Sequence, residues 1–285
     1  MGHSVVEAAE QLLDKEIKVL DKGFVRLVDY MGSDDRIVQS ARVSYGAGTK
    51  SFREDKGLIN YLMRNRHTSP FEQVILTFHT KMPIFVARQW VRHRTARLNE
   101  ISGRYSIMED EFYVPEMEHI AIQSEDNKQG RSSEPMEHEA AEAFRTSLAS
   151  EQAASYKTYL EHIDAGVARE LARVNLPLSL YTQWYWQIDL HNLFHFLSLR
   201  IDPHAQYEIR AYADVMMDCA RAVAPIATDA FEQHMVGNVC FSAQEFAVLQ
   251  LILAGQSLDD AAQSLGIKGR ALDRLRAKLS GGQPH

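Results

Sequence analysis

The order of strand-like and helix-like segments is the feature that most constrains how this chain can fold. Residues 23–30 have a strand pattern, 35–44 and 53–66 have helix patterns, and 74–79 alternate apolar with polar side chains as a strand does. Helices and strands therefore do not alternate regularly, and a parallel sheet built from βαβ units is not expected. The sequence predicts a domain that mixes α and β structure in another way.

Helical patterns dominate the second half of the chain. A polar segment at 124–133 predicts an exposed loop. Four helices are predicted after it, over 135–163, 165–175, 180–199 and 203–223. Asp202 and Pro203 suit the N-cap and the first position of the last helix, and Asp34 or Asp35 suits the start of the helix at 35–44.

The character of the sequence changes after Asn238, so we predict two domains, over 1–237 and 238–285. Gly255 and Gly266 separate short helical patterns in the second domain, a spacing that faintly resembles a helix-turn-helix. Residues 239–285 carry five basic and four acidic side chains, which is far from the basic surface of a DNA-binding domain. A packing or oligomerisation role is favoured, and no nucleic-acid partner is expected.

Composition argues against several other classes of protein. The chain has no run of about eighteen apolar residues and no leader-like N-terminus, so we expect a cytoplasmic protein without a membrane span. Its two cysteines, Cys219 and Cys240, are too few for a disulfide framework or a thiolate metal site. Cys219 lies in an apolar helical pattern and is expected to be a packed core thiol.

A basic stretch from Gln89 to Tyr105 stands out in a chain whose formal net charge is −7. Between Arg88 and Arg104 there are five arginines and one carboxylate, Glu100. A helix over 83–93 is predicted to lead into it. The guanidinium group of arginine can bind a phosphate through two parallel hydrogen bonds. The serine hydroxyl and the glycine backbone N–H of the Ser-Gly pair at 102–103 would let an anion approach closely. The stretch predicts an anion site, with a surface cluster of ion pairs as the alternative.

Two further groups of residues carry chemistry. His191 and His195 are four residues apart on a helical pattern, but Asn192 replaces the glutamate of the zinc-protease signature and no third ligand is evident. No metal is therefore predicted, and these imidazoles line a pocket or pack in the core. Arg200 lies between two helical patterns, where it can either satisfy terminal carbonyls or project its fork into a pocket.

The basic stretch resembles the signature of the flavin-dependent thymidylate synthases, in which RHR is followed by seven residues and then Ser. Here these are Arg92, His93, Arg94 and Ser102. Three other blocks, HTSPFEQ, ARVNLPLSLYTQWYW and HNLFHFLSLRIDPHAQYEIR, are similar to blocks of the same family in the same order. The resemblance covers residues 20–235 and leaves the C-terminal extension outside it.

This resemblance implies an α+β fold, with a sheet flanked by helices, assembled as a homotetramer that holds FAD and dUMP between subunits. It implies reductive methylation of dUMP to dTMP, with methylenetetrahydrofolate as the carbon donor and NADPH or NADH as the source of a hydride that passes through FAD. Neither cysteine resembles the nucleophile of the other class of thymidylate synthase, so no enzyme nucleophile is expected.

The resemblance also assigns ligands to positions of this chain. For dUMP these are Gln89, Trp90, Val91, Arg92, Glu100, Ile101, Ser102, Gly103, Arg104, Arg173 and Arg200. For FAD they are Ser69, Arg92, His93, Arg94, Glu100, Asp189, Leu190, His191 and His195, with His67 close to the flavin. Asp189 and His191 stand where Asn and Arg are expected in the family, so contacts to FAD can differ there.

Physical reasoning assigns the catalytic role to Arg200, because a fixed cation at the uracil edge stabilises the negative charge that forms when N3 ionises. Ser102 as a nucleophile is the alternative, but it needs an adjacent base that its surroundings do not supply apart from Glu100. Two other functions stay open. One is a protein that binds flavin and nucleotide without synthase activity, and the other is a nucleic-acid-binding regulator that uses the C-terminal helices.

Overall fold

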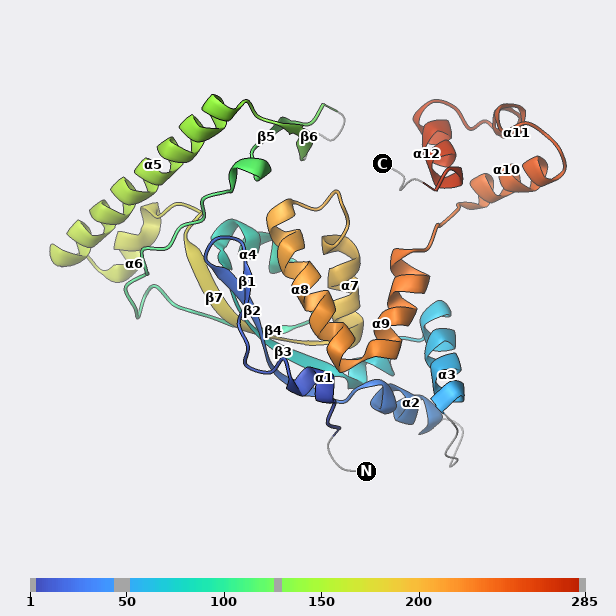
Figure 1. Cartoon of the computed structure of the whole chain (residues 1–285), viewed down its shortest axis with the longest axis horizontal. Coiled ribbons are helices and arrows are strands. Elements are labelled where there is room, and N and C mark those ends of the chain that lie inside the picture. Colours follow the sequence, from blue (N-terminus) through green and yellow to red (C-terminus); the bar gives the residue numbers. More distant parts are fainter. Residues whose placement is uncertain (1–3, 44–51, 126–129, 282–285) are drawn as a thin grey trace. The chain divides into compact units, whose positions relative to one another are not determined.

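A five-stranded antiparallel sheet forms the centre of the first of two units into which the chain divides, residues 1–235 and 236–285. The computed structural model describes residues 4–43, 52–125 and 130–281. The strands, in their order across the sheet, are β1 (Ile17–Val19), β2 (Gly23–Met31), β3 (Ile75–Pro83), β7 (Tyr181–Asp189) and β4 (Arg97–Glu100) (Figure 1). The predicted strands at 23–30 and 74–79 are confirmed as β2 and β3, and both extend further than predicted.

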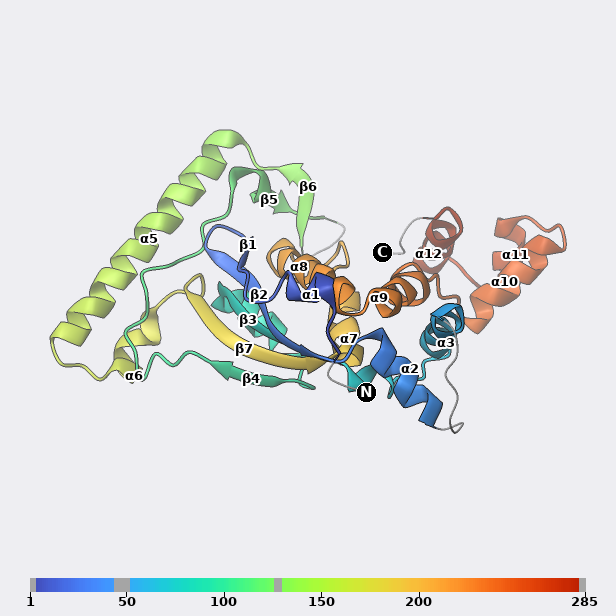
Figure 2. The same ribbon diagram turned by 60° about the horizontal axis from the view of Figure 1, so that its bottom comes forward.

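Three helices cover one face of this sheet, α4 (Ile84–Trp90), α7 (Leu190–Arg200) and α8 (Tyr207–Val223) (Figure 1, Figure 2). Trp90 of α4 is fully buried between these layers, and its ring lies 5.5 Å from that of Trp184 and 5.3 Å from that of Trp186, both on β7. The nearly perpendicular rings pack edge to face, an arrangement that aromatic pairs favour. This aromatic core fixes α4 and α7 against the centre of the sheet.

The remaining elements lie around this core. They are α1 (Glu7–Glu10), α2 (Asp34–Arg42), α3 (Phe52–Arg64), α5 (His138–Asp164), α6 (Arg169–Ala172), α9 (Pro225–Phe231) and the hairpin of β5 (Ala121–Gln123) with β6 (Arg131–Pro135). Strand β6 begins inside the segment 124–133 that was predicted to be a loop, and 126–129 lie outside the described residues. The long predicted helix at 135–163 is confirmed as α5. An α+β fold with helices against a sheet is also confirmed.

The helix predicted over 180–199 is wrong in its first half, where the chain forms β7. β7 pairs with β3 on one side and β4 on the other, so its backbone groups are satisfied as a central strand. Its aromatic and threonine side chains favour strands, and tryptophans 184 and 186 point to the same buried face. Asp189 then ends the strand and caps α7, because its carboxylate accepts a hydrogen bond from the Asn192 N–H at 2.9 Å.

Two predicted helix starts are also wrong. α8 begins at Tyr207, because Asp202 accepts the His204 N–H at 2.8 Å and holds a turn there instead of capping a helix. At α2 the N-cap position belongs to Ser33. The Asp34 carboxylate instead accepts the first two N–H groups of α9, those of Ile226 at 2.8 Å and of Ala227 at 2.9 Å. A local sequence pattern does not reveal that an acidic residue caps a helix almost two hundred positions away.

The described part of the second unit, residues 236–281, contains three short helices with their own small core. They are α10 (Ala243–Leu253), α11 (Leu258–Ser264) and α12 (Arg270–Leu279), separated as predicted at Gly255 and Gly266. Both glycines have positive φ, +95° and +76°, which a residue without a side chain adopts without strain. Val248, Ala262 and Leu275 form part of the core. Among the described residues, no helix is long and apolar enough to cross a bilayer.

Candidate active site

Arg200, the last residue of α7, lies against the end of α4. Its Nε donates a hydrogen bond to Nε2 of His93 at 3.2 Å, and its Nη2 donates to the Gln89 carbonyl oxygen, also at 3.2 Å. Arg200 makes no ion pair within the described part of the chain. The structure therefore brings together residues from two predicted blocks that are 107 positions apart in sequence.

His93 is held neutral by its surroundings. Its ring lies 4.9 Å from that of Phe196 and 5.9 Å from that of His195, both on α7. Burial, then the positive charge of Arg200, then His195 lower the pKa of His93 to about 4. At neutral pH the imidazole is uncharged, which leaves Nε2 free to accept the Arg200 hydrogen bond.

The helix predicted over 83–93 is shorter than expected, and the basic stretch after it, which was predicted to be a loop, contains a strand. α4 ends at Trp90, and residues 97–100 form β4 against β7. This edge strand positions Glu100, whose Oε1 accepts a hydrogen bond from the Thr182 hydroxyl at 2.6 Å. Thr182 is buried on β7, and sequence reasoning missed it because an alternating threonine in a strand carries no functional signal.

The loop after β4, which contains Ser102 and Gly103, packs against Arg173. The Ser102 hydroxyl accepts the Arg104 backbone N–H at 3.3 Å, and the Ser102 carbonyl accepts the Tyr105 N–H at 3.0 Å. A Cβ added to the buried Gly103 would lie 3.0 Å from Cδ of Arg173. Only glycine therefore allows Arg173 to pack so closely against the loop, and the structure brings this predicted pair together.

Not every predicted dUMP ligand can offer its side chain. Trp90 is fully buried in the aromatic core, so its side chain faces the sheet and not a ligand. Arg104 is exposed and pairs through Nε with Glu170 at 3.1 Å.

The predicted FAD residues divide into two kinds. His67, Ser69, Arg92, Arg94 and His195 are exposed, and neither arginine has an ion pair or hydrogen bond in the part of the chain that the structure describes. Asp189 has both carboxylate oxygens engaged by Asn192, through its N–H and through its side-chain amide at 2.8 Å. This contact explains how an aspartate is accommodated next to a predicted anion site, because its oxygens are turned into the helix N-terminus.

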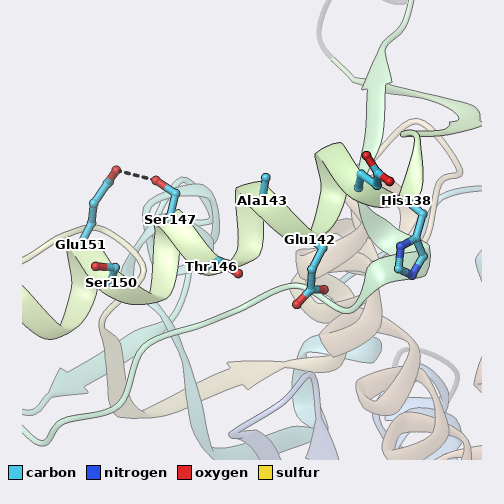
Figure 3. Close-up of a pocket in the computed structure, with 8 residues that line it drawn as sticks. His138, Glu142, Ala143, Thr146, Ser147, Ser150 and Glu151 are labelled. Carbon is cyan, nitrogen blue, oxygen red and sulfur yellow. Dashed lines mark hydrogen bonds between the residues drawn. The ribbon is translucent and has the colours of Figure 1, made fainter.

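A hollow on the surface runs along α5 and holds none of these residues (Figure 3). Side chains of this one helix line it, His138, Glu139, Glu142, Ala143, Thr146, Ser147, Ser150 and Glu151. Within residues 4–43, 52–125 and 130–281, no group of three potential metal ligands is present. The candidate active site therefore comprises two groups, Arg200 with His93, and Glu100 and Arg173 beside the loop of Ser102.

Comparisons with known proteins find the same family in both units of the chain. Residues 26–226 match the family model described as thymidylate synthase complementing protein, and 239–285 match the model of the thymidylate synthase ThyX C-terminal domain. The extension that the sequence resemblance left out thus has a family model of its own. The matched blocks include every residue of the candidate active site.

Two relatives named flavin-dependent thymidylate synthase cover most of the chain. The protein of Treponema denticola is 59% identical over 95% of this chain and 99% of its own, and that of Treponema pallidum is 56% identical over 99% of this chain and 90% of its own. Among solved structures, a UMP/dUMP methylase from Streptomyces cacaoi bound with 5-Br dUMP superposes with a TM-score of 0.71. It is 32% identical and covers 77% of this chain and 99% of its own.

Proposed function

The chain belongs to the flavin-dependent thymidylate synthase family, and from this premise we propose how its own residues carry out the reaction. The enzyme methylates dUMP to dTMP and uses a flavin. We infer that the flavin is FAD, that methylenetetrahydrofolate is the carbon donor, and that NADPH or NADH is the reductant. The carbon arrives as a methylene group and needs a hydride to become methyl, which the bound flavin supplies.

Arg200 is the proposed catalytic residue, and its unneutralised charge is the observation that carries this assignment. Its partners are both neutral acceptors, His93 and the Gln89 carbonyl, so no carboxylate cancels the charge within the described residues. Placed at the N3 and O2 edge of uracil, such a cation favours loss of the N3 proton. The electron density this releases makes C5 nucleophilic, and C5 exchanges its hydrogen for the methyl group.

The phosphate and ribose of dUMP are proposed to lie over the loop that contains Ser102 and Gly103. Arg173 packs against Gly103, and its guanidinium has no ion pair within the described residues. The exposed pair of Arg104 with Glu170 is of a kind that contributes little energy, so a phosphate can replace Glu170 there. Gln89, Trp90, Val91 and Ile101 are proposed to complete the contacts with dUMP.

The residues present fit a flavin dinucleotide. Arg92 and Arg94 are exposed guanidiniums without partners in the described residues, which suits a pyrophosphate. His67 and Ser69 are exposed in the loop after α3, and Leu190 and His191 begin α7 directly after the capping Asp189. Glu100 is proposed to contact both FAD and dUMP, with its carboxylate oriented by Thr182.

Ser102 is not proposed as a nucleophile. Its hydroxyl oxygen accepts a hydrogen bond from the Arg104 N–H of its own loop. No histidine or carboxylate forms a hydrogen bond to it within the described residues, and an unactivated serine is a weak nucleophile. Positioning the nucleotide is the role that this geometry supports.

A homotetramer with shared active sites is proposed as the working form, and the enzyme is expected to act in the cytoplasm on small molecules without a nucleic-acid partner. Two features support the assembly. Several proposed FAD residues are exposed in a single subunit, and one face of α5, with small, polar and acidic side chains, is exposed in the described structure (Figure 3). Subunits that meet here would complete both surfaces.

The proposal is tested with the purified protein loaded with FAD. We expect a yellow protein whose flavin absorbance changes when dUMP is added, and which forms dTMP with methylenetetrahydrofolate and NADPH. Arg200→Ala should keep the flavin spectrum and lose turnover. A protein that binds flavin and dUMP but forms no dTMP would support the alternative of a binding protein. A protein that cannot be reconstituted with FAD would refute the proposal.

A further inference from the structure

The contact between His93 and Arg200 has a chemical consequence beyond the proposed binding of FAD by His93. A guanidinium has five N–H donors in a fixed planar fork, so holding its Nε–H at one acceptor sets the plane of the whole group. The His93 imidazole accepts this N–H, and the Gln89 carbonyl accepts one from Nη2. The other N–H groups of Arg200 make no hydrogen bond within the described residues and remain for a ligand.

The acceptor must be neutral if Arg200 is to act on uracil. A carboxylate at position 93 would hold the guanidinium more strongly, but its charge would cancel the cation that the ionised uracil needs. A protonated imidazole could not accept the hydrogen bond and would repel Arg200. The groups that face the ring are Arg200, His195 and the apolar Phe196, and the first two oppose a positive charge on His93.

We propose that His93 is a positioning residue for catalysis, which accepts the Nε–H of Arg200 through Nε2 and aims the guanidinium at uracil without neutralising it. This inference rests on the proposed role of Arg200. It requires the tautomer of His93 that carries its proton on Nδ1, since Nε2 must be free to accept. It also gives the central histidine of the RHR motif a role that does not depend on contact with FAD.

The first test compares His93→Leu with His93→Gln, because the glutamine amide oxygen can take the place of Nε2 as an acceptor. Turnover is measured as dTMP formed per bound flavin, so a change in FAD content does not enter the result. We expect His93→Leu to lower kcat by up to about 100-fold, the effect of misplacing a reacting group by roughly 1 Å, while KM for dUMP changes little. His93→Gln should recover most of the loss.

The pH profile gives a second readout that a merely structural role would not move. With Arg200 misaligned, N3 ionisation receives less help from the enzyme, so kcat of His93→Leu should rise more steeply toward alkaline pH than that of the wild type. His79→Leu is the matched control, because His79 also contacts an arginine, Arg26, with 2.8 Å between Nδ1 and Nη2, but lies outside the candidate site. This control should keep the wild-type kcat and pH profile.

Three outcomes would overturn the proposal. They are an unchanged kcat per flavin in His93→Leu, an equal loss in His93→Leu and His93→Gln, and a loss that appears only as a higher KM. Failure of the underlying function has a different signature, because Arg200→Ala would then retain turnover or the wild-type enzyme would form no dTMP. The flavin spectrum of each variant, recorded with and without dUMP, verifies that both sites are still formed.

Discussion

The buried hydroxyl of Thr182 donates a hydrogen bond of 2.6 Å to the carboxylate of Glu100. Glu100, at the end of β4, pairs in the sheet with Trp184 of β7, and Thr182 lies two residues along β7 from that partner. Glu100 is itself exposed, so this one contact from the rigid central strand limits where its carboxylate can point. The proposed role of Glu100 as a contact for both dUMP and FAD depends on its carboxylate being held in this way.

Thr182→Val should therefore lower activity without unfolding the enzyme. Valine has nearly the shape of threonine but cannot donate, and a hydrogen bond to a charged group is worth about 1.5–3 kcal/mol. We expect kcat/KM for dUMP to fall by about tenfold or more for a loss of this size. Thr182→Ser, which keeps the hydroxyl, should stay near the wild type. Steady-state kinetics with a thermal melting curve for each variant measure the effect, and equal activity of Val and Ser would contradict it.

Gly103→Ala should weaken dUMP binding through Arg173. The new Cβ would lie 2.9 Å from Sδ of Met108 and 3.0 Å from Cδ of Arg173, so one of these side chains must move. If Arg173 moves, its proposed contact with the dUMP phosphate is lost, and KM for dUMP should rise by about tenfold or more. Titration of the flavin spectrum with dUMP gives the affinity directly.

Gly57→Ala is the matched control for this substitution. A Cβ at position 57, on α3, meets no atom within 4 Å, and alanine favours a helix more than glycine does. This variant should bind dUMP like the wild type and be at least as stable. If both alanine variants bind dUMP normally, the proposed phosphate site is wrong.

Some elements of the fold could be predicted from the sequence and others could not, for physical reasons. The long α5, the alternating β2 and β3 and the glycine-separated C-terminal helices have periodic or turn signals that are local in sequence. β7 was mistaken for a helix because an aromatic run followed by a helical one has no turn residue between them, and the pairing with β3 and β4 that makes it a strand is non-local. The aromatic and threonine side chains of β7 favour a strand, but this weak preference becomes decisive only through the pairing.

In the candidate site, too, some features could be predicted from the sequence and others needed the structure. The basic stretch was visible in the sequence as charge, and the family resemblance supplied Arg173 and Arg200 by position. The hydrogen bond between His93 and Arg200, the support of Glu100 by Thr182 and the engagement of Asp189 by Asn192 needed the structure. Each of these contacts depends on a rotamer and a distance, which no spacing along the chain encodes.

Asp34 should make stability depend on pH in a defined direction. Burial above all, with smaller contributions from Asp35 and Asp229, raises the pKa of Asp34 from 3.8 to about 6, although two N–H groups of α9 oppose the shift. A carboxyl with a raised pKa binds its proton more readily in the folded state. Its contribution to stability is therefore complete below about pH 4 and is lost as the pH rises through about 6.

Asp34→Asn removes the titrating carboxyl, so the difference in stability between wild type and variant reports the contribution of Asp34 alone. The free energy of unfolding of the wild type, minus that of the variant, should fall between pH 4 and pH 7 by at most about 3 kcal/mol, the equivalent of about two pKa units. Urea unfolding at fixed protein concentration measures both proteins across this range. A difference that stays constant, or that grows with pH, would show that Asp34 is not held with a raised pKa.

The ion pair of Arg131 with Glu208 should show an asymmetric response to substitution. Glu208 of α8 is 3% exposed, and its oxygens accept hydrogen bonds from Arg131 of β6 at 2.6 and 2.7 Å and from the Tyr113 hydroxyl at 3.1 Å. Arg131→Met leaves a buried carboxylate without its cation, which costs about 3–5 kcal/mol. Glu208→Gln should cost less, because the amide still accepts from Tyr113 and the partly exposed Arg131 can reach water.

The double variant distinguishes a pairwise interaction from general damage to the fold. If the unpaired carboxylate is the cause, Arg131→Met should destabilise the Glu208→Gln variant much less than it destabilises the wild type. The loss of unfolding free energy caused by Arg131→Met should differ between the two backgrounds by more than about 1 kcal/mol. Arg276→Met, which removes an exposed ion pair with Asp259, is expected to change stability by less than about 1 kcal/mol. Additive effects of the two substitutions in urea unfolding would mean that the hairpin of β5 and β6 is held to α8 by packing alone.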